Sequence, residues 1–190
     1  MRRLLPALRQ TPHRPVVAFA GHRDLSRVAP AGVLRHTLER LFLRIADAGP
    51  APLLACGGAM GADRLAIHAW RRATGADALL LLGPGDARAR YAGAIGRLRL
   101  PTHADQSQRL VDLADLLVVA WDGHPPRGPG GVADTVARAR RADIEVIWAA
   151  PDGAFGLRYA RGDGAWAPDA VFTRTRGLAL AWDLAGSPRD

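Results

Sequence analysis

The chain contains no lysine, only one cysteine and few aromatic residues, and none of its apolar runs is long. The single cysteine, Cys56, cannot form a disulfide within the chain, and its place at the end of an apolar run predicts a small buried side chain. No apolar stretch approaches the roughly 20 residues that a membrane-spanning helix needs. We therefore predict a soluble, cytoplasmic protein that does not contact a membrane.

Arginine supplies all of the Lys and Arg charge, and the formal net charge is +8. Such a charge commonly indicates a polyanionic partner, above all nucleic acid. The arginines are scattered, however, and no aromatic residue is interleaved with a basic run, as stacking on single strands would require. DNA binding is therefore kept only as a weaker alternative.

The length of 190 residues and the hydrophobic content of 48% are typical of one domain with a substantial core. Five short apolar runs lack the alternation of half-exposed strands, which predicts parallel strands that are covered on both faces. These runs span residues 15–20, 52–56, 78–82, 116–121 and 145–149.

Apolar residues at three- and four-residue spacing predict helices between these runs. Helices are expected at 33–48, 65–74, 107–114 and 131–142, with another at 86–98, whereas 101–105 is expected to be irregular. Strands that alternate with helices predict an α/β fold, a Rossmann-like doubly wound and mainly parallel sheet of about five strands with helices on both faces. We expect residues 1–14 to form a loose N-terminal arm, 15–150 the domain, and 151–190 a C-terminal extension packed on the domain or on a partner subunit.

Glycine-bearing loops follow three of the predicted strands. They span residues 21–24 (GHRD), 57–63 (GGAMGAD) and 122–131 (DGHPPRGPGG). The carboxyl ends of the strands in a doubly wound sheet meet at one edge, where ligands bind near the reversal of strand order. Glycines allow a ligand to approach the backbone, and a helix N-terminus presents N–H groups and the positive end of a dipole. The three loops therefore predict a phosphate site.

The same loops resemble those of the SLOG superfamily, which is named for the Smf/DprA and LOG proteins and includes the YpsA-type proteins. The resemblance covers about residues 16–149 and lies in GHRD, GGAMGAD and the segment ADLLVVAWDGHPPRGPGGVADTVARAR at 114–140. It implies a Rossmann-like fold that binds nucleotides or nucleotide-derived ligands. Some LOG proteins cleave the bond between a nucleobase and ribose 5'-monophosphate.

The chain departs from the superfamily at two places. Bacterial SLOG proteins have a D-G-x-P-x-x-G-x-G-G-T loop, and here Val132 occupies the threonine position, so one hydroxyl that bonds phosphate is missing. Such a hydrogen bond to a charged group contributes roughly 1.5–3 kcal/mol. The LOG pattern P-G-G-x-G-T-x-x-E places its glutamate at Thr135 or, in a second alignment, at Ala137, and neither is a carboxylate. Asp134 is rotated by about 100° from Thr135 on a helix, which argues against a LOG-type glycosidase.

We expect the ligand-binding residues to lie on the three loops and at the start of the following helix. They are Gly21, His22, Arg23, Asp24, Gly57, Gly58, Asp63, Asp122, Gly123, Arg127, Gly128, Gly130, Gly131, Val132 and Asp134. No catalytic residue is assigned.

Several of these side chains have a structural explanation as well as a functional one. Arg23 either binds a phosphate or forms an ion pair with Asp24 or Asp63. Asp63 fits a stabilising carboxylate in the first turn of a helix at least as well as a ligand contact. Asp122 either accepts bonds from a ribose or base or braces its loop, and two loop histidines, His22 and His124, are candidates for proton transfer.

The sequence contains no metal-ligand spacing, no G-x-S-x-G and no Walker-type motif, so we predict no metal and no cofactor. The leading hypothesis is a protein that binds, and senses, a nucleotide or nucleotide-derived phosphate ligand. The alternative is a hydrolase of nucleoside monophosphates that uses Asp122, Asp134 or Asp63 together with His22 or His124. A homodimer is expected from the resemblance.

Overall fold

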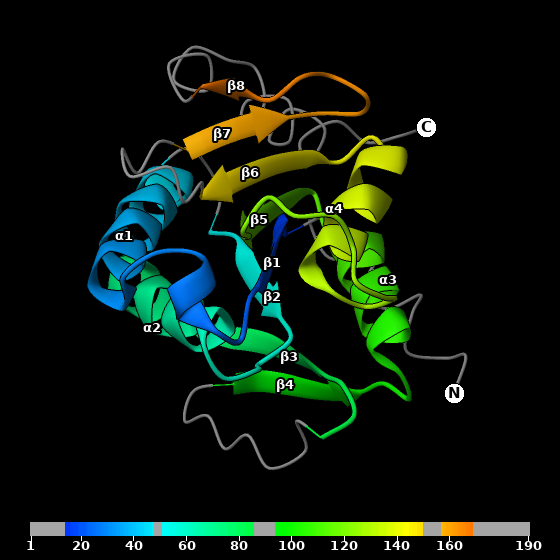
Figure 1. Cartoon of the computed structure of the whole chain (residues 1–190). Coiled ribbons are helices and arrows are strands. Elements are labelled where there is room, and N and C mark those ends of the chain that lie inside the picture. Colours follow the sequence, from blue (N-terminus) through cyan, green and yellow to red (C-terminus); the bar gives the residue numbers. More distant parts are fainter. Residues whose placement is uncertain (1–13, 48–50, 86–93, 150–156, 169–190) are drawn as a thin grey trace, which may run out of the picture.

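A computed structural model describes residues 14–47, 51–85, 94–149 and 157–168 of the chain, and these residues form one layered α/β structure (Figure 1). The strands are β1 (Val16–Gly21), β2 (Leu53–Cys56), β3 (Ala78–Leu82), β4 (Ala94–Arg99), β5 (Leu116–Ala120), β6 (Glu145–Ala149), β7 (Leu157–Ala160) and β8 (Ala167–Pro168). The helices are α1 (Ala31–Asp47), α2 (Ala62–Thr74), α3 (His103–Leu113) and α4 (Val132–Arg141), and a 3-10 turn, η2, spans Leu25–Arg27.

The strands form a single sheet in the order β4-β3-β2-β1-β5-β6-β7-β8. The strands β4, β3, β2, β1, β5 and β6 run parallel to one another. Strand β7 is antiparallel to β6, and β8 is antiparallel to β7. The chain builds outward from β1 to β4 on one side and then returns to pair β5 with the other side of β1. The reversal of strand order therefore lies between β1 and β5, which is where ligands bind in doubly wound sheets.

Helices cover both faces of the sheet, with α1 and α2 on one face and α3 and α4 on the other (Figure 1). The apolar side chains of α1 recur at helical spacing and are buried against α2 and the sheet. Strands β5 and β6 are buried along their whole length, as strands covered on both faces must be. The prediction of a Rossmann-like α/β fold with helices on both faces is confirmed.

The number of strands and one helix were predicted wrongly. Within the described residues the sheet has eight strands rather than about five. Residues 94–99 form strand β4 and not the end of a helix. Gly96 disfavours a helix, and the segment pairs with β3 as the edge strand of the sheet. The rest of the predicted helix, 86–93, lies outside the described residues.

Strands β7 and β8 extend the sheet beyond β6 and come from the region expected to be a C-terminal extension. Trp166 packs there against Trp148 of β6, with ring centroids 5.1 Å apart. The segments 1–13 and 169–190 lie outside the described residues, so the division into an arm, a domain and an extension stays a prediction. None of the described helices has the length and apolar character needed to cross a membrane.

Two adjacent residues of α1 test the packing between α1 and α2. Phe42 is fully buried and meets Trp70 edge to face at 5.2 Å, whereas Leu43 is 45% exposed. We expect Phe42→Ala to lower the free energy of unfolding by about 3–5 kcal/mol, because it removes a buried ring and leaves a cavity. The matched variant Leu43→Ala should change it by about 0.5 kcal/mol or less. Urea unfolding followed by circular dichroism measures both, and equal effects would contradict the packing described.

Candidate functional site

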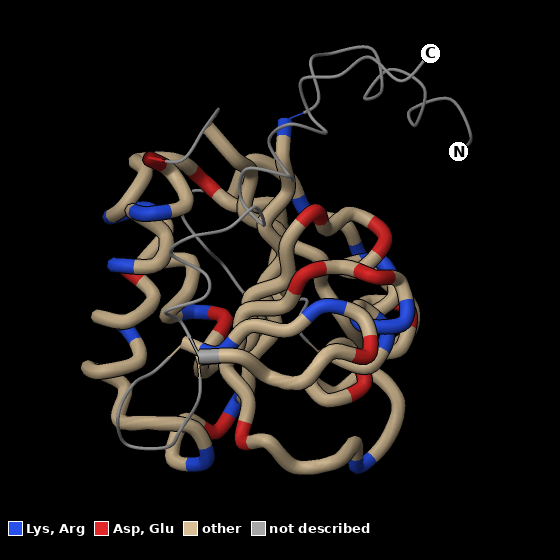
Figure 2. Tube along the Cα trace, turned by 90° about the horizontal axis from the view of Figure 1, so that it is seen from above, with Lys and Arg blue, Asp and Glu red and all other residues tan. Residues whose placement is uncertain are grey.

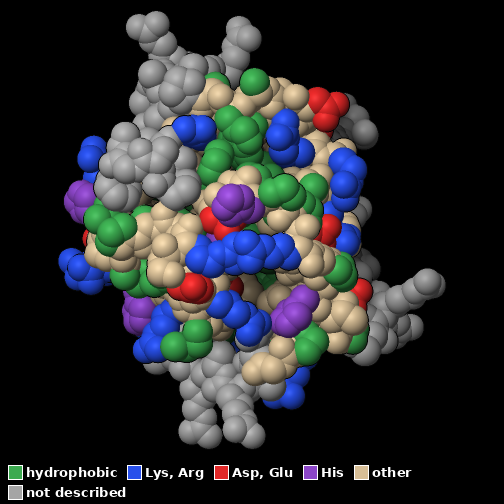
Figure 3. Space-filling model, in the orientation of Figure 1, with side chains coloured by type: hydrophobic (Ala, Val, Ile, Leu, Met, Phe, Trp, Pro, Cys, Tyr) green, Lys and Arg blue, Asp and Glu red, His purple; other side chains and the backbone are tan. Residues whose placement is uncertain are grey.

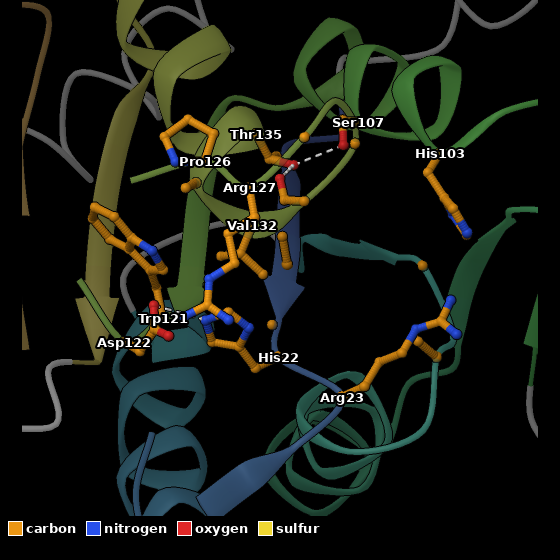
Figure 4. Close-up of a pocket in the computed structure, with 18 of the residues that line it drawn as sticks. His22, Arg23, His103, Ser107, Trp121, Asp122, Pro126, Arg127, Val132 and Thr135 are labelled. Carbon is orange, nitrogen blue, oxygen red and sulfur yellow. Dashed lines mark hydrogen bonds and ion pairs between the residues drawn. The ribbon is translucent and has the colours of Figure 1, made fainter. Parts of the chain in front are cut away.

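A cavity of about 490 Å³ lies at the carboxyl ends of the central strands, between the loops that follow β1, β2 and β5. The first residues of α3 and α4 close it on the side of the second helical layer, and Figure 4 shows the side chains that line it. Arginine and histidine side chains stand close together near the middle of the face seen in Figure 3. Because the loops after β1 and β5 both line the cavity, the cavity lies where the strand order reverses.

Most of the sequence-predicted site residues line this cavity. These are Gly21, His22, Arg23, Asp24, Gly57, Asp63, Asp122, Arg127, Gly128, Gly130, Gly131 and Val132. Gly58, Gly123 and Asp134 are not among the residues that line it. His124, considered for proton transfer, also lines the cavity.

Asp122 is the centre of a polar cluster directly after β5. Its Oδ1 lies 3.0 Å from Nε2 of His22, and its Oδ2 pairs with the guanidinium of Arg27 from η2. The backbone N–H of His124 also donates to Oδ1, at 3.2 Å, and so closes a tight turn at the start of the loop. The side chain of Asp122 is only 7% exposed. Asp122 thus ties the loop after β5 to the loop after β1.

The surroundings of Asp122 favour its charged form. Burial alone raises the pKa of its carboxyl group, but the hydrogen bonds from the His124 N–H and from His22, with the charges of His22 and Arg27, lower the pKa below its ordinary value. The carboxylate is therefore ionised near neutral pH. The interpretation of Asp122 as a brace for its loop accounts for these contacts.

The start of α4 lines the cavity, and its capping position carries no side chain. The residue that precedes the helix, Gly131, makes no side-chain cap, and a Cβ atom placed there would meet only the Gly128 carbonyl oxygen, at 3.9 Å. Asp134 lies behind this loop, where its Oδ2 accepts the N–H of Gly130 at 2.8 Å and pairs with Arg138 at 2.9 Å. Asp134 therefore holds the loop in shape from outside the cavity.

The glycines of the first two loops serve packing. A Cβ atom on Gly21 would lie 2.4 Å from Cβ of Ala62, the first residue of α2. On Gly57 it would lie 2.8 Å from Oδ2 of Asp63, and that carboxylate accepts the N–H of Ala59 at 3.1 Å. These contacts let α2 begin close to the ends of β1 and β2.

Sequence reasoning missed a group of polar side chains that come from α3 and the start of α4. Of these His103, Gln106, Ser107 and Thr135 line the cavity. The hydroxyl oxygens of Ser107 and Thr135 lie 2.8 Å apart, and Figure 4 shows this contact between the two helices.

His103 and Gln106 were missed because α3 begins four residues earlier than predicted, so 103–105 are helical and not irregular. The signal was present in the sequence. Thr102 caps α3 by accepting the N–H of Asp105 at 3.0 Å, and its hydroxyl donates to the Asp105 carboxylate at 2.7 Å. A threonine followed three residues later by an acidic residue is a sequence signature of a helix N-terminus.

The acidic side chains that line the cavity are already engaged within the protein. Asp24 accepts hydrogen bonds from the N–H and hydroxyl groups of Ser26, and the Ser26 hydroxyl is the first of the causes that lower its pKa. Asp63 and Asp122 accept the bonds described above. Burial raises the pKa of the Cys56 thiol well above its ordinary value, so Cys56 is an inert core residue. In the part of the chain that the structure describes, no three His, Cys, Asp or Glu side chains gather as metal ligands.

Solved structures share this architecture. A structural genomics target, TM1055, is 21% identical with a TM-score of 0.51, and the match covers 70% of this chain and 72% of that one. Two structures of the molybdenum cofactor carrier protein of Chlamydomonas reinhardtii are 18% and 23% identical, with TM-scores of 0.50 and 0.52, and each match covers 72% of this chain and 76% of the carrier. No family model and no curated protein matches the chain. The likeness establishes the Rossmann-like fold.

The cluster around Asp122 predicts a stability that depends on pH. Asp122→Asn should lower the free energy of unfolding at pH 7 by about 1.5–3 kcal/mol, because charge-assisted hydrogen bonds to His22, Arg27 and His124 are weakened. The pKa of this carboxyl is lower in the folded state than in the unfolded chain. Its stabilisation is therefore complete above about pH 4 and is lost as the pH falls toward the folded pKa.

Urea unfolding of the two proteins between pH 3 and pH 7 measures this difference, which should shrink below about pH 4. Asp112→Asn, which changes an exposed carboxylate of α3, is the control. A difference between wild type and Asp122→Asn that stays constant over this range would show that the carboxylate has no special environment.

Proposed function

We propose that the chain binds a nucleotide or a nucleotide-derived phosphate ligand in the cavity between the loops after β1, β2 and β5. The observation that carries the proposal is the start of α4, which faces the cavity from the end of β5 and has glycine in the capping position. The first N–H groups of a helix have no partner within it, and together with the helix dipole they attract an anion.

The surroundings of this helix start are suited to a phosphate group. A Cβ atom on Gly131 would meet only the Gly128 carbonyl oxygen, so this position leaves room for a phosphate oxygen beside the start of the helix. Arg127 from the same loop lines the cavity and is exposed, and Arg23 lines it from the end of β1. Guanidinium groups bind phosphate oxygens through two parallel hydrogen bonds. Val132 offers no hydroxyl, so the backbone and the arginines carry this contact.

The size of the cavity and the structural neighbours support a small-molecule ligand. A volume of about 490 Å³ falls within the roughly 300–1,000 Å³ typical of ligand pockets. Two of the neighbouring structures are of one molybdenum cofactor carrier protein. The resemblance of the three loops to SLOG proteins points to nucleotide-derived ligands at the same strand ends, and we infer membership of that superfamily from it.

Binding is favoured over hydrolysis. Neither alignment of the LOG pattern places a carboxylate at the position of its glutamate, and Thr135, which takes that position in one of them, is buried against Ser107. Basic and acidic residues also alternate around the chain and do not form one basic face in the view from above (Figure 2), which gives DNA binding no added support. A binding or sensing protein is the function that these observations fit best.

The test is a thermal-shift screen against nucleoside mono-, di- and triphosphates, dinucleotides, cyclic nucleotides, ADP-ribose and molybdenum cofactor. A ligand at 100 times its Kd should add about 2.7 kcal/mol to the free energy of unfolding. Gly131→Glu should abolish this stabilisation, because its carboxylate would stand where the phosphate binds and repel it. Titration calorimetry of each stabilising compound then gives its Kd.

Gly131→Gln is the matched control, since it has nearly the same size as Gly131→Glu but no charge. It should weaken binding less than the glutamate does. If no compound stabilises the wild type, or if Gly131→Glu binds as the wild type does, the start of α4 is not a phosphate site and the proposal fails. Release of free nucleobase from a nucleoside monophosphate during these assays would favour the hydrolase instead.

A further inference from the structure

The side chain of Gln106 has one orientation that satisfies its neighbours. Its amide nitrogen lies 2.5 Å from the Leu81 carbonyl oxygen and 3.4 Å from that of Gly57. Carbonyl oxygens only accept hydrogen bonds, so the NH₂ group must face them and Oε1 must point the other way. Gln106 is 8% exposed and thus buried between α3 and the ends of β2 and β3. Its amide orientation is therefore fixed by the backbone.

This orientation determines which nitrogen of His103 carries a proton. Oε1 of Gln106 lies 3.2 Å from Nδ1 of His103. Because an amide oxygen cannot donate, Nδ1 must be the protonated nitrogen, and in the neutral imidazole Nε2 then has a lone pair to offer. His103 is half-buried and lines the cavity. Figure 4 shows that its ring projects from the start of α3.

Three glycines make room for this pair. A Cβ atom on Gly83, after β3, would lie 2.6 Å from Nδ1 of His103, and one on Gly57 would lie 2.8 Å from Nε2 of Gln106. On Gly130 it would lie 2.4 Å from the carbonyl carbon of His103. Three separate segments thus lack a side chain where His103 and Gln106 lie. Gly83 lies against the imidazole, Gly57 against the Gln106 amide and Gly130 against the backbone of His103.

We propose that His103 is a specificity-determining residue of the cavity, whose Nε2 accepts a hydrogen bond from a hydroxyl or N–H group in the sugar or base of the ligand. The inference rests on the proposed function and deepens it. Phosphate and pyrophosphate present mainly acceptor oxygens, which the start of α4 and the arginines match. A nitrogen that only accepts matches the donor groups of the nucleoside part. His103 therefore selects for phosphate esters that carry such a donor.

The first test measures the binding of ADP, ADP-ribose and inorganic pyrophosphate to the wild type and to His103→Ala by titration calorimetry. His103→Ala should weaken ADP or ADP-ribose about 10-fold, the value of one hydrogen bond, and change pyrophosphate less than about 2-fold. Equal weakening of all the probes, or no weakening, overturns the role of His103. In that case Gly131→Glu still abolishes binding if the proposed function is correct.

If no compound of the thermal-shift screen binds the wild type, or if Gly131→Glu leaves binding unchanged, the proposed function fails and this inference fails with it. If the wild type binds compounds of the screen but neither ADP nor ADP-ribose, this inference alone is overturned. The two failures are therefore distinguishable. Melting curves of each variant show that it is folded.

Gly83→Ala displaces the imidazole without altering either side chain of the pair. It should reproduce the selective loss of ADP or ADP-ribose, because its methyl group would lie 2.6 Å from Nδ1 of His103 and 2.8 Å from Oε1 of Gln106 and would push both side chains out of position. Gly32→Ala is the matched control, since a Cβ atom there meets nothing within 4 Å. If Gly83→Ala binds the probes as Gly32→Ala does, the position of His103 does not matter and the proposal is overturned.

A spectroscopic measurement tests the tautomer without any ligand. ¹⁵N NMR of the wild-type protein at about pH 8, above the range in which histidines are ordinarily charged, should show His103 protonated at Nδ1. His103→Ala identifies the signal. Protonation at Nε2 would overturn the proposal, because that nitrogen could then not accept a bond from the ligand.

Discussion

Strand β5 pairs with β1 rather than with β4, the strand that precedes it in the chain, and the cavity depends on this pairing. The side-chain carboxylate of Asp115, which precedes β5, accepts the backbone N–H of Val16 at 2.8 Å. This hydrogen bond holds the two strands together at their start. At their other end, the Ala120 carbonyl accepts the N–H of His22 at 3.1 Å. The residues that follow, His22 and Asp122, are therefore brought within 3.0 Å of each other. The parallel register sets the spacing of the two loops.

A second constraint is the close approach of α3 and α4 at their N-termini. Gly130 lies so near the backbone of His103 that any side chain at this position would collide with it, and its φ of +82° also favours glycine. The contact between Ser107 and Thr135 holds the two helices together one turn further along. Residues from the first turns of both helices thus line one cavity.

The central layer of the protein could be predicted because its signals are local. Runs such as 116–121 are too apolar for anything but a buried strand, and the glycine-bearing loops at their ends mark one edge of the sheet. Strand β4 could not be predicted in this way. Its side chains are mostly exposed and include Gly96, and it is a strand because it pairs with β3, which is a non-local interaction. His103 and Gln106 were missed because they come from a helix whose start was placed too late.

The same contacts that shape the cavity bear on its chemistry. A general base needs a lone pair that faces the substrate and a pKa near the working pH. The pKa values of Asp24 and Asp122 are both lowered, and the oxygens of these two side chains are directed at Ser26, His22, Arg27 and the backbone. A carboxylate with a lowered pKa binds a proton weakly, so it is a poor general base. The charges of Asp24 and Asp122 instead hold the loops after β1 and β5 and the guanidinium of Arg27 in position.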